Sequence, residues 1–139
     1  MILNQSRERM MSQKLLASLL ISCAFLGSSA VSAADLEANM KTLAKSTKAF
    51  AETMDVDNAK QQLVVMREAT VSSKQYLPHR LEGLPSENVK VKEYQASLDQ
   101  LVAEIDKVTV LVEQGQLDQA KAEAINLVKI RNENHKKFR

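Results

Sequence analysis

Residues 91–112 read VKEYQASLDQLVAEIDKVTVLV, and this stretch decides the fold. Its apolar side chains recur at strictly alternating steps of three and four residues, which is the period of an α-helix. They are Val91, Tyr94, Leu98, Leu101, Ile105, Val108 and Val112. This alternation is typical of a long helix that packs at a shallow angle against its neighbours. The stretch therefore predicts a helical bundle.

Three further apolar stripes have the same spacing. The first contains Leu36, Met40, Leu43, Thr47, Phe50 and Met54; the second Ala59, Leu63, Met66, Thr70, Ser73 and Leu77; the last Leu117, Ala120, Ala124, Leu127, Arg131, His135 and Phe138. Capping or helix-stopping residues lie between the stripes, at Asp55, at Pro85 followed by Ser86 as N-cap, and at Gly115. Short first and third connections force antiparallel neighbours, so we predict an all-α, up-down-up-down antiparallel four-helix bundle.

The composition excludes other broad classes. Only three of the 139 residues are glycine and two are proline, which is too little turn material for a protein of many strands. Hydrophobic residues make up 45% of the chain and charged residues 26%. These proportions are typical of one ordinary folded domain and not of a disordered chain.

The first 33 residues have the pattern of a secretory signal peptide. A basic segment, an apolar run and a cleavage motif of small residues follow one another: Arg7, Arg9 and Lys14, then residues 15–26, then Val31-Ser32-Ala33. The apolar run is too short to span a membrane. Met1, Met10 and Met11 are all candidate start residues. We therefore expect export and a mature domain of residues 34–139, without a transmembrane segment.

Removal of this leader also removes the excess positive charge. The whole chain has 19 Lys and Arg against 17 Asp and Glu, and the leader contains three of the former and one of the latter. Residues 34–139 therefore carry 16 of each and are formally neutral. A nucleic-acid partner is not expected, because binding to the phosphate backbone depends on a basic surface.

Cys23, the only cysteine, lies within the leader. A product cleaved after Ala33 therefore has no thiol and no disulfide, and packing or a cofactor must stabilise it. The sequence Leu20-Ile21-Ser22-Cys23 also fits the pattern of a lipoprotein cysteine that becomes acylated. A lipid anchor through Cys23 is the alternative to a freely exported product.

Met40 and His135 are the candidate metal ligands. In the predicted topology the first helix begins and the last helix ends at the same end of the bundle, so these two residues should lie at similar depth. A thioether sulfur and an imidazole nitrogen facing each other across the core suit the two axial positions of a haem iron. Spacing alone leaves other roles open, since methionine often fills cores and a histidine in a last helical turn suits the helix dipole.

Arg131 and Arg139 lie near the same predicted end of the bundle. Both side chains could meet acidic groups there. Haem propionates are such groups, but so are Asp35 and Glu37, with which the arginines would form surface ion pairs that contribute little to stability. The charges therefore do not decide between a haem site and ordinary surface pairs.

Short motifs at both ends of residues 34–139 occur together in a known family. They are Ala34-Asp35-Leu36-Glu37 with Asn39-Met40, Met66-Arg67, the Gly115 turn, and Arg131-Asn132 with His135 and Lys137-Phe138-Arg139. On these motifs the segment resembles the cytochrome b562 family, without an evident gap. The resemblance implies one non-covalently bound b-type haem (haem b) per subunit, with Met40 and His135 as axial ligands. It also implies further residues near the macrocycle or its propionates: Leu36, Glu37, Leu43, Met66, Pro78, Tyr94, Leu98, Arg131 and Arg139.

Three positions depart from the family pattern. Leu98 stands where a well-known member has an aromatic ring, Phe138 replaces a tyrosine, and His79 replaces the second of two adjacent prolines. None of the three removes a ligand, so they bear on haem affinity and redox potential. We expect His79 to be solvated.

The resemblance implies a monomeric periplasmic electron-transfer protein and not an enzyme, because two protein ligands leave no open position on the iron. Its redox donor and acceptor are not identified by the sequence. Covalent attachment is not expected, since Cys-x-x-Cys-His is absent, and Glu-x-x-His pairs of a di-iron bundle are absent as well. The alternative function is a haem-free exported bundle that acts as a binding or chaperone-like module.

Overall fold

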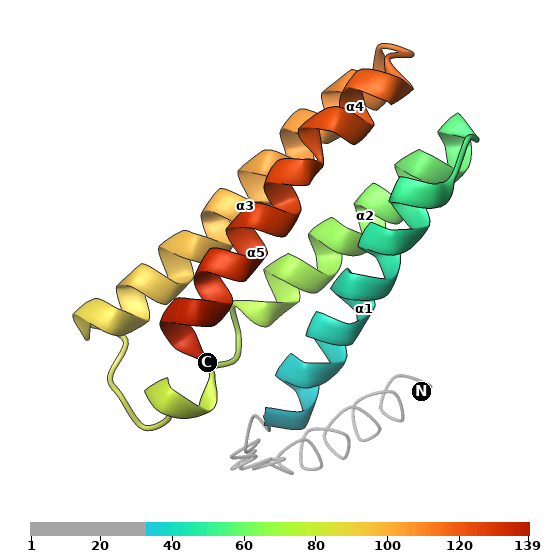
Figure 1. The fold of residues 1–139 in the computed structure, drawn as a ribbon. Helices are drawn as coiled ribbons and strands as arrows, with labels where there is room; N and C mark the ends of the chain where they lie inside the picture. The colour runs from blue at the N-terminus through green and yellow to red at the C-terminus, as the bar shows by residue number, and fades with distance from the viewer. Residues whose placement is uncertain (1–32) are drawn as a thin grey trace, which may run out of the picture.

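The computed structural model describes residues 33–139, which form a four-helix bundle (Figure 1). The elements are α1 (Ala33–Glu52), α2 (Val56–Ser73), a short 3₁₀ helix η1 (His79–Leu81), α3 (Val89–Glu113), α4 (Leu117–Glu123) and α5 (Ile125–Phe138). α1 packs against α2, α2 against α3, and α3 against both α4 and α5. The predictions on the start residue, on Cys23 and on the leader up to Ser32 lie outside the described residues.

Capping side chains and a left-handed glycine determine where the helices of the bundle begin and end. The Asp55 carboxylate accepts a hydrogen bond from the Asn58 N–H at 2.6 Å and so caps α2. Gly115 ends α3 with a φ of +74°, a conformation that glycine adopts without steric cost. The predicted N-cap of the third helix at Ser86 was wrong. Residues 85–88 form a turn, in which the Asn88 N–H donates to the Pro85 carbonyl at 2.9 Å, and Asn88 caps α3.

The fourth helix is interrupted at Ala124, where the stripe had predicted one continuous helix. The Leu127 N–H donates to the Ala124 carbonyl at 3.0 Å, three residues back instead of four, so the backbone tightens locally. α4 and α5 nevertheless continue in one direction (Figure 1), and Ala120, Ala124 and Leu127 are all buried. The break therefore leaves the packing face of the fourth helix continuous.

The main core runs along the middle of the bundle. Every member of the stripe in residues 91–112 is buried, as that pattern predicted. Phe50, Leu63 and Met66 from α1 and α2 join it and are at most 1% exposed. The prediction that Met54 belongs to the packed face of the first helix was wrong. α1 ends at Glu52, and the Met54 side chain just beyond it is 78% exposed.

A second, smaller core lies at the end of the bundle that holds η1 and the C-terminus (Figure 1). Its buried members are Leu81, Val91, Tyr94, Leu98 and Phe138. The rings of Tyr94 and Phe138 meet edge to face with centroids 5.5 Å apart, which joins the start of α3 to the end of α5. None of the helices in residues 33–139 has the length and apolar character of a membrane span.

Candidate functional site

A cavity of about 610 Å³ lies at this end of the bundle, within the size range typical of small-molecule and cofactor sites. Its apolar lining comprises Leu36, Met40, Leu43, Ala44, Leu77, Pro78, Tyr94, Leu98, Leu101 and Phe138. Its polar lining comprises Glu37, Lys41, His79, Arg80, Ser97, Arg131, Asn134, His135 and Arg139. Residues from the start of α1, the segment around η1, the first half of α3 and the end of α5 therefore meet around one space.

Met40 and His135 both line this cavity. Met40 is half-buried on α1, where it packs against the main core. His135 lies in the last turn of α5 and is exposed. The chain reversals thus bring the two candidate ligands to the same cavity from different helices.

The Met40 sulfur differs from the other methionine sulfurs of residues 33–139. The Met66 sulfur accepts a hydrogen bond from the Thr47 hydroxyl at 3.2 Å. The Met54 sulfur lies 3.5 Å from the ammonium of Lys121. No hydrogen bond within the described range involves the Met40 sulfur, which leaves its lone pairs available to a ligand.

The two histidines differ in the same way. His79 is on the surface, with Nδ1 3.0 Å from the Glu82 carboxylate and a side chain that is 91% exposed. The prediction that the His79 side chain is solvated is confirmed, although His79 also lines the edge of the cavity. Among the residues that the structure describes, the His135 imidazole takes part in no hydrogen bond or ion pair. His135 is therefore the histidine with free ring nitrogens.

The surroundings of His135 favour its neutral form. Partial burial lowers its pKa below the ordinary 6.5, and the positive charges of Arg131 and Arg139 lower the pKa further. A neutral imidazole keeps the lone pair that coordination to a metal requires. The arginines therefore act on His135 electrostatically as well as lining the cavity.

Charges at the cavity rim are only partly paired. Glu37 and Lys41, one helical turn apart, form an ion pair at 2.8 Å, and this hydrogen bond lowers the pKa of Glu37. Arg131 donates to the side-chain oxygen of the adjacent Asn132 at 3.1 and 3.3 Å. Within residues 33–139, neither Arg131 nor Arg139 is ion-paired with a carboxylate, so both remain available to an anionic ligand.

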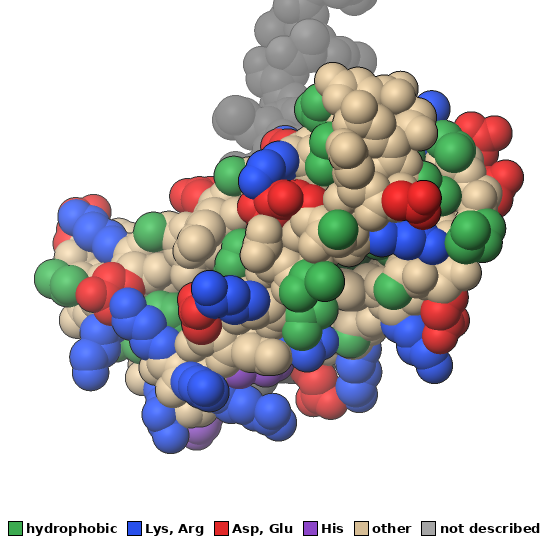
Figure 2. All heavy atoms as spheres, turned by 45° about the horizontal axis from the view of Figure 1, so that its top comes forward, with side chains coloured by type: hydrophobic (Ala, Val, Ile, Leu, Met, Phe, Trp, Pro, Cys, Tyr) green, Lys and Arg blue, Asp and Glu red, His purple; other side chains and the backbone are tan. Residues whose placement is uncertain are grey.

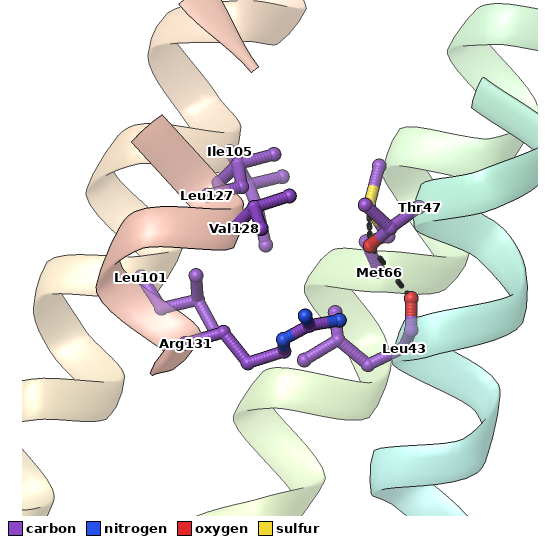
Figure 3. Close-up of a pocket in the computed structure, with 8 residues that line it drawn as sticks. All are labelled: Leu43, Thr47, Met66, Leu101, Ile105, Leu127, Val128 and Arg131. Carbon is purple, nitrogen blue, oxygen red and sulfur yellow. Dashed lines mark hydrogen bonds between the residues drawn. The ribbon is translucent and has the colours of Figure 1, made fainter. Parts of the chain in front are cut away.

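Of the nine residues that the resemblance placed near a macrocycle, all except Met66 line the cavity. Met66 is fully buried and lines a separate void of about 10 Å³, together with Thr47 and the core side chains of α3 and α5. Leu43, Leu101 and Arg131 border both spaces. Figure 3 shows the Arg131 side chain extending from α5 towards Leu43 of α1, so Arg131 forms part of the partition between void and cavity.

Several lining residues were not identified from the sequence as site residues. Leu77, Leu101 and Phe138 belong to the apolar stripes, which mark them as core but give no sign of a cavity. Ser97 and Asn134 each precede a stripe residue, at Leu98 and His135. Nothing in their spacing distinguishes them from solvated helix positions.

Tyr94 contributes a neutral polar group to the cavity wall. Burial raises its pKa to about 12, so the phenol stays protonated at ordinary pH. Its hydroxyl lies 3.5 Å from the Ser73 carbonyl, at the outer limit of a hydrogen bond. Leu98, which replaces the family's aromatic ring, is buried one turn further along α3.

The cavity does not present a cluster of hard metal ligands. No group of three or more His, Cys, Asp or Glu within residues 33–139 could hold a metal ion. The available donors are instead one soft sulfur and one imidazole. Such a pair completes the coordination of a metal that already has ligands of its own, as in a macrocycle.

Comparisons with known proteins identify the family of this chain. The family model described as cytochrome b562 matches residues 35–139. A Yersinia pestis protein named probable soluble cytochrome b562 2 is 34% identical over 124 residues, which cover 86% of this chain and 94% of the relative. A second Yersinia pestis protein, named probable soluble cytochrome b562 1, is 27% identical over 121 residues, covering 87% and 90%.

Proposed function

This chain belongs to the cytochrome b562 family, and we propose that it binds one b-type haem non-covalently through Met40 and His135 and transfers electrons in the periplasm. The family consists of haem-binding electron carriers and not of enzymes. A bound haem would supply a one-electron iron couple. The remaining chemistry comes from the residues around the cavity.

The observation that carries the proposal is the match between the free donors and the cavity. Within the described residues, Met40 and His135 are the methionine and the histidine whose side chains form no hydrogen bond, and both line the same cavity. The Met66 sulfur is instead hydrogen-bonded to Thr47 in the core, and the His79 imidazole contacts Glu82 on the surface. These two side chains, one from each of two helices, would hold the iron of a bound haem.

The other lining residues suit the remaining surfaces of a haem. Leu36, Leu98 and Leu101 present apolar surface that excludes water and lowers the local dielectric, which stabilises the less charged ferrous state. Arg131 and Arg139 would hold the propionate carboxylates by charge-assisted hydrogen bonds. The soft thioether of Met40 also favours ferrous iron and raises the potential relative to two histidines.

Export and removal of residues 1–33 are part of the proposal. The relatives are named soluble cytochromes, and the described helices include none that could span a membrane. Mass spectrometry of the mature N-terminus tests this part. A terminus at Ala34 agrees with signal cleavage, whereas an acylated Cys23 terminus would replace it with the lipid-anchored alternative.

A haem titration of the purified protein tests the ligands. We expect one haem per chain, with sharp bands in the reduced visible spectrum that are lost in both Met40→Ala and His135→Ala. The matched controls are Met54→Ala and His79→Ala, which remove the exposed methionine and the solvated histidine and should keep the bands. A wild-type protein that folds but takes up no added haem would contradict the proposal and favour the haem-free binding module.

A further inference from the structure

The three methionines of residues 33–139 differ in how far solvent reaches them. Met66 is 0% exposed in the main core, and Met40 is half-buried beside the cavity. Met54 is 78% exposed, in the short segment that joins α1 to α2. An oxidant must reach a thioether sulfur to convert it to the sulfoxide, so susceptibility follows exposure. Of the described methionines, Met54 is therefore the one most open to an oxidant in solution.

The Met54 sulfur also has a cation beside it. Its distance to the Lys121 ammonium nitrogen (Nζ) is 3.5 Å, and Lys121 lies in the last turn of α4. Lys121 forms no ion pair with a carboxylate of residues 33–139. A thioether is only a weak hydrogen-bond acceptor, whereas an ammonium group has three N–H donors. A stronger acceptor in place of this sulfur would therefore strengthen the contact.

The contact connects the turn between α1 and α2 to α4. Elsewhere α1 is linked by side-chain hydrogen bonds to α2, for example from Asn39 to Ser72 at 3.0 Å. The fourth helix is linked to α3, for example from Asn126 to Glu104 at 3.4 Å. Within the described residues, no other hydrogen bond or ion pair joins the α1–α2 turn to α4. Both elements lie at the end of the bundle away from η1 and the C-terminus (Figure 1).

We propose that Met54 is an oxidation site, at which a peroxide forms the sulfoxide and thereby strengthens the link to Lys121. Hydrogen peroxide transfers one oxygen atom to the sulfur, so that the S–O bond forms as the O–O bond breaks. The sulfur is oxidised by two electrons, and the other peroxide oxygen leaves as water with both hydrogens. This reaction needs no haem, so the inference is independent of the proposed function.

A sulfoxide oxygen suits the Lys121 ammonium. It is bonded directly to a sulfur that already lies 3.5 Å from Nζ, so rotation of the exposed side-chain bonds brings it within hydrogen-bond distance. A bond from an ammonium group to a polar oxygen is charge-assisted and stronger than the bond to sulfur. Because Met54 is largely exposed, the added polarity carries no burial cost. The same reaction at the buried Met66 would put an oxygen into the core and disrupt its packing.

An apolar docking surface is the competing explanation for an exposed methionine. Figure 2 turns this end of the bundle forwards and shows hydrophobic side chains scattered among Lys, Arg, Asp and Glu side chains. Apolar binding sites are contiguous patches instead. Near Met54 in the chain, the one other large hydrophobic residue is Val56, which lies between Asp55 and Asp57. The setting therefore favours reaction with a small polar molecule over docking of an apolar partner.

Peroxide oxidation of the purified protein, followed by peptide mass spectrometry, tests the site. The haem-free form is used so that no iron reacts with the peroxide. Met54 should form the sulfoxide at least about tenfold faster than Met40 or Met66, because exposure controls access. In urea-unfolded protein the three methionines should react at similar rates, which would show that the fold produces the selectivity. Equal rates for Met54 and Met40 in the folded protein would overturn the proposal.

Thermal unfolding of the protein oxidised at Met54 alone tests the link to Lys121. The midpoint should rise by about 2 °C, the scale expected of one exposed charge-assisted contact. Lys121→Gln should abolish the rise, whereas Lys60→Gln, which removes an exposed charge from α2, should retain it. Met54→Gln places an amide carbonyl where the sulfoxide would be and should raise the midpoint without peroxide. Met54→Leu, which offers no acceptor, should not.

Two results would contradict the link between the turn and α4. A midpoint that is unchanged or lower after oxidation would show that the sulfoxide does not bind Lys121. A rise that survives Lys121→Gln would assign the effect to another partner. Failure to bind haem would remove the proposed function but leave both measurements unaffected, because neither uses bound haem.

Discussion

Met40 on α1 and His135 in the last turn of α5 line the same cavity, although 95 positions separate them in the chain. Three reversals of the chain produce this proximity, and Leu43, Leu101 and the Tyr94–Phe138 pair surround it. Neither the Met40 sulfur nor the His135 imidazole takes part in a hydrogen bond within the described bundle. The hydrogen bonding of the bundle therefore does not depend on the two candidate donor groups, so their substitution should leave the fold intact.

Two methionines should differ clearly in their effect on stability. Met66 is fully buried, so Met66→Ala should lower the free energy of unfolding of the haem-free protein by about 2–5 kcal/mol through the cavity that it leaves. Met40 is half-buried, so Met40→Ala should cost less than about 2 kcal/mol. Urea unfolding followed by circular dichroism measures both. A larger loss in Met40→Ala than in Met66→Ala would contradict this assignment.

The His135 imidazole should titrate below its ordinary pKa of 6.5 in the haem-free protein, because partial burial and the nearby arginines disfavour its charged form. Arg131→Gln should raise this pKa. NMR signals of the imidazole followed against pH give both values, and Lys129→Gln, on an exposed position of α5, is the control. An equal His135 pKa in the wild type and in Arg131→Gln would show that Arg131 does not act on it.

The same shift makes stability depend on pH in a defined direction. Because the folded pKa of His135 is lower than the unfolded one, the unfolded chain binds more protons at pH values between the two. This contribution to stability is present above the unfolded pKa and is lost as the pH falls through the folded one. His135→Gln should weaken this loss in acid, as measured by thermal unfolding at a series of pH values.

Tyr94 should produce the opposite dependence in alkali. Its folded pKa of about 12 exceeds the ordinary value of 10, so the folded protein holds the phenolic proton where the unfolded chain has lost it. Stability should therefore fall as the pH rises from about 10 towards 12. Tyr94→Phe removes the proton and should remove this part of the fall. An unchanged alkaline profile in Tyr94→Phe would assign the loss to other groups.

Gly115 should be sensitive to substitution for a conformational reason alone. Its φ of +74° is unfavourable for residues with a Cβ, and no atom lies within 4 Å of the position that a Cβ would occupy. Gly115→Ala should cost about 1–2 kcal/mol of unfolding free energy, and Gly115→Asn less, because asparagine tolerates this conformation better. Haem affinity should stay unchanged, since Gly115 is at the end of the bundle away from the cavity. Equal stability of all three proteins would argue against the left-handed turn.

The candidate site was only partly accessible from the sequence. The topology predicted that the two ends of the domain meet, which is why Met40 and His135 could be paired as candidates before the fold was known. The sequence did not indicate that Met66 lies outside the cavity, or that Arg131 extends across the interior towards Leu43. Both facts depend on how far the helices separate, and spacing along one helix carries no information about that distance.

The amino-acid sequence by itself determined that the chain forms helices and which face of α3 packs. It also determined that Asp55 caps the start of α2 and that Gly115 ends α3. These features depend on contacts within a few residues, because helical hydrogen bonds and caps are local. Tertiary structure alone decided that Met54 faces solvent, that Ser46 is buried and that the fourth helix breaks at Ala124. It also decided that the ends of the bundle enclose a cavity, because burial and open space depend on the side chains that each helix meets on its neighbours.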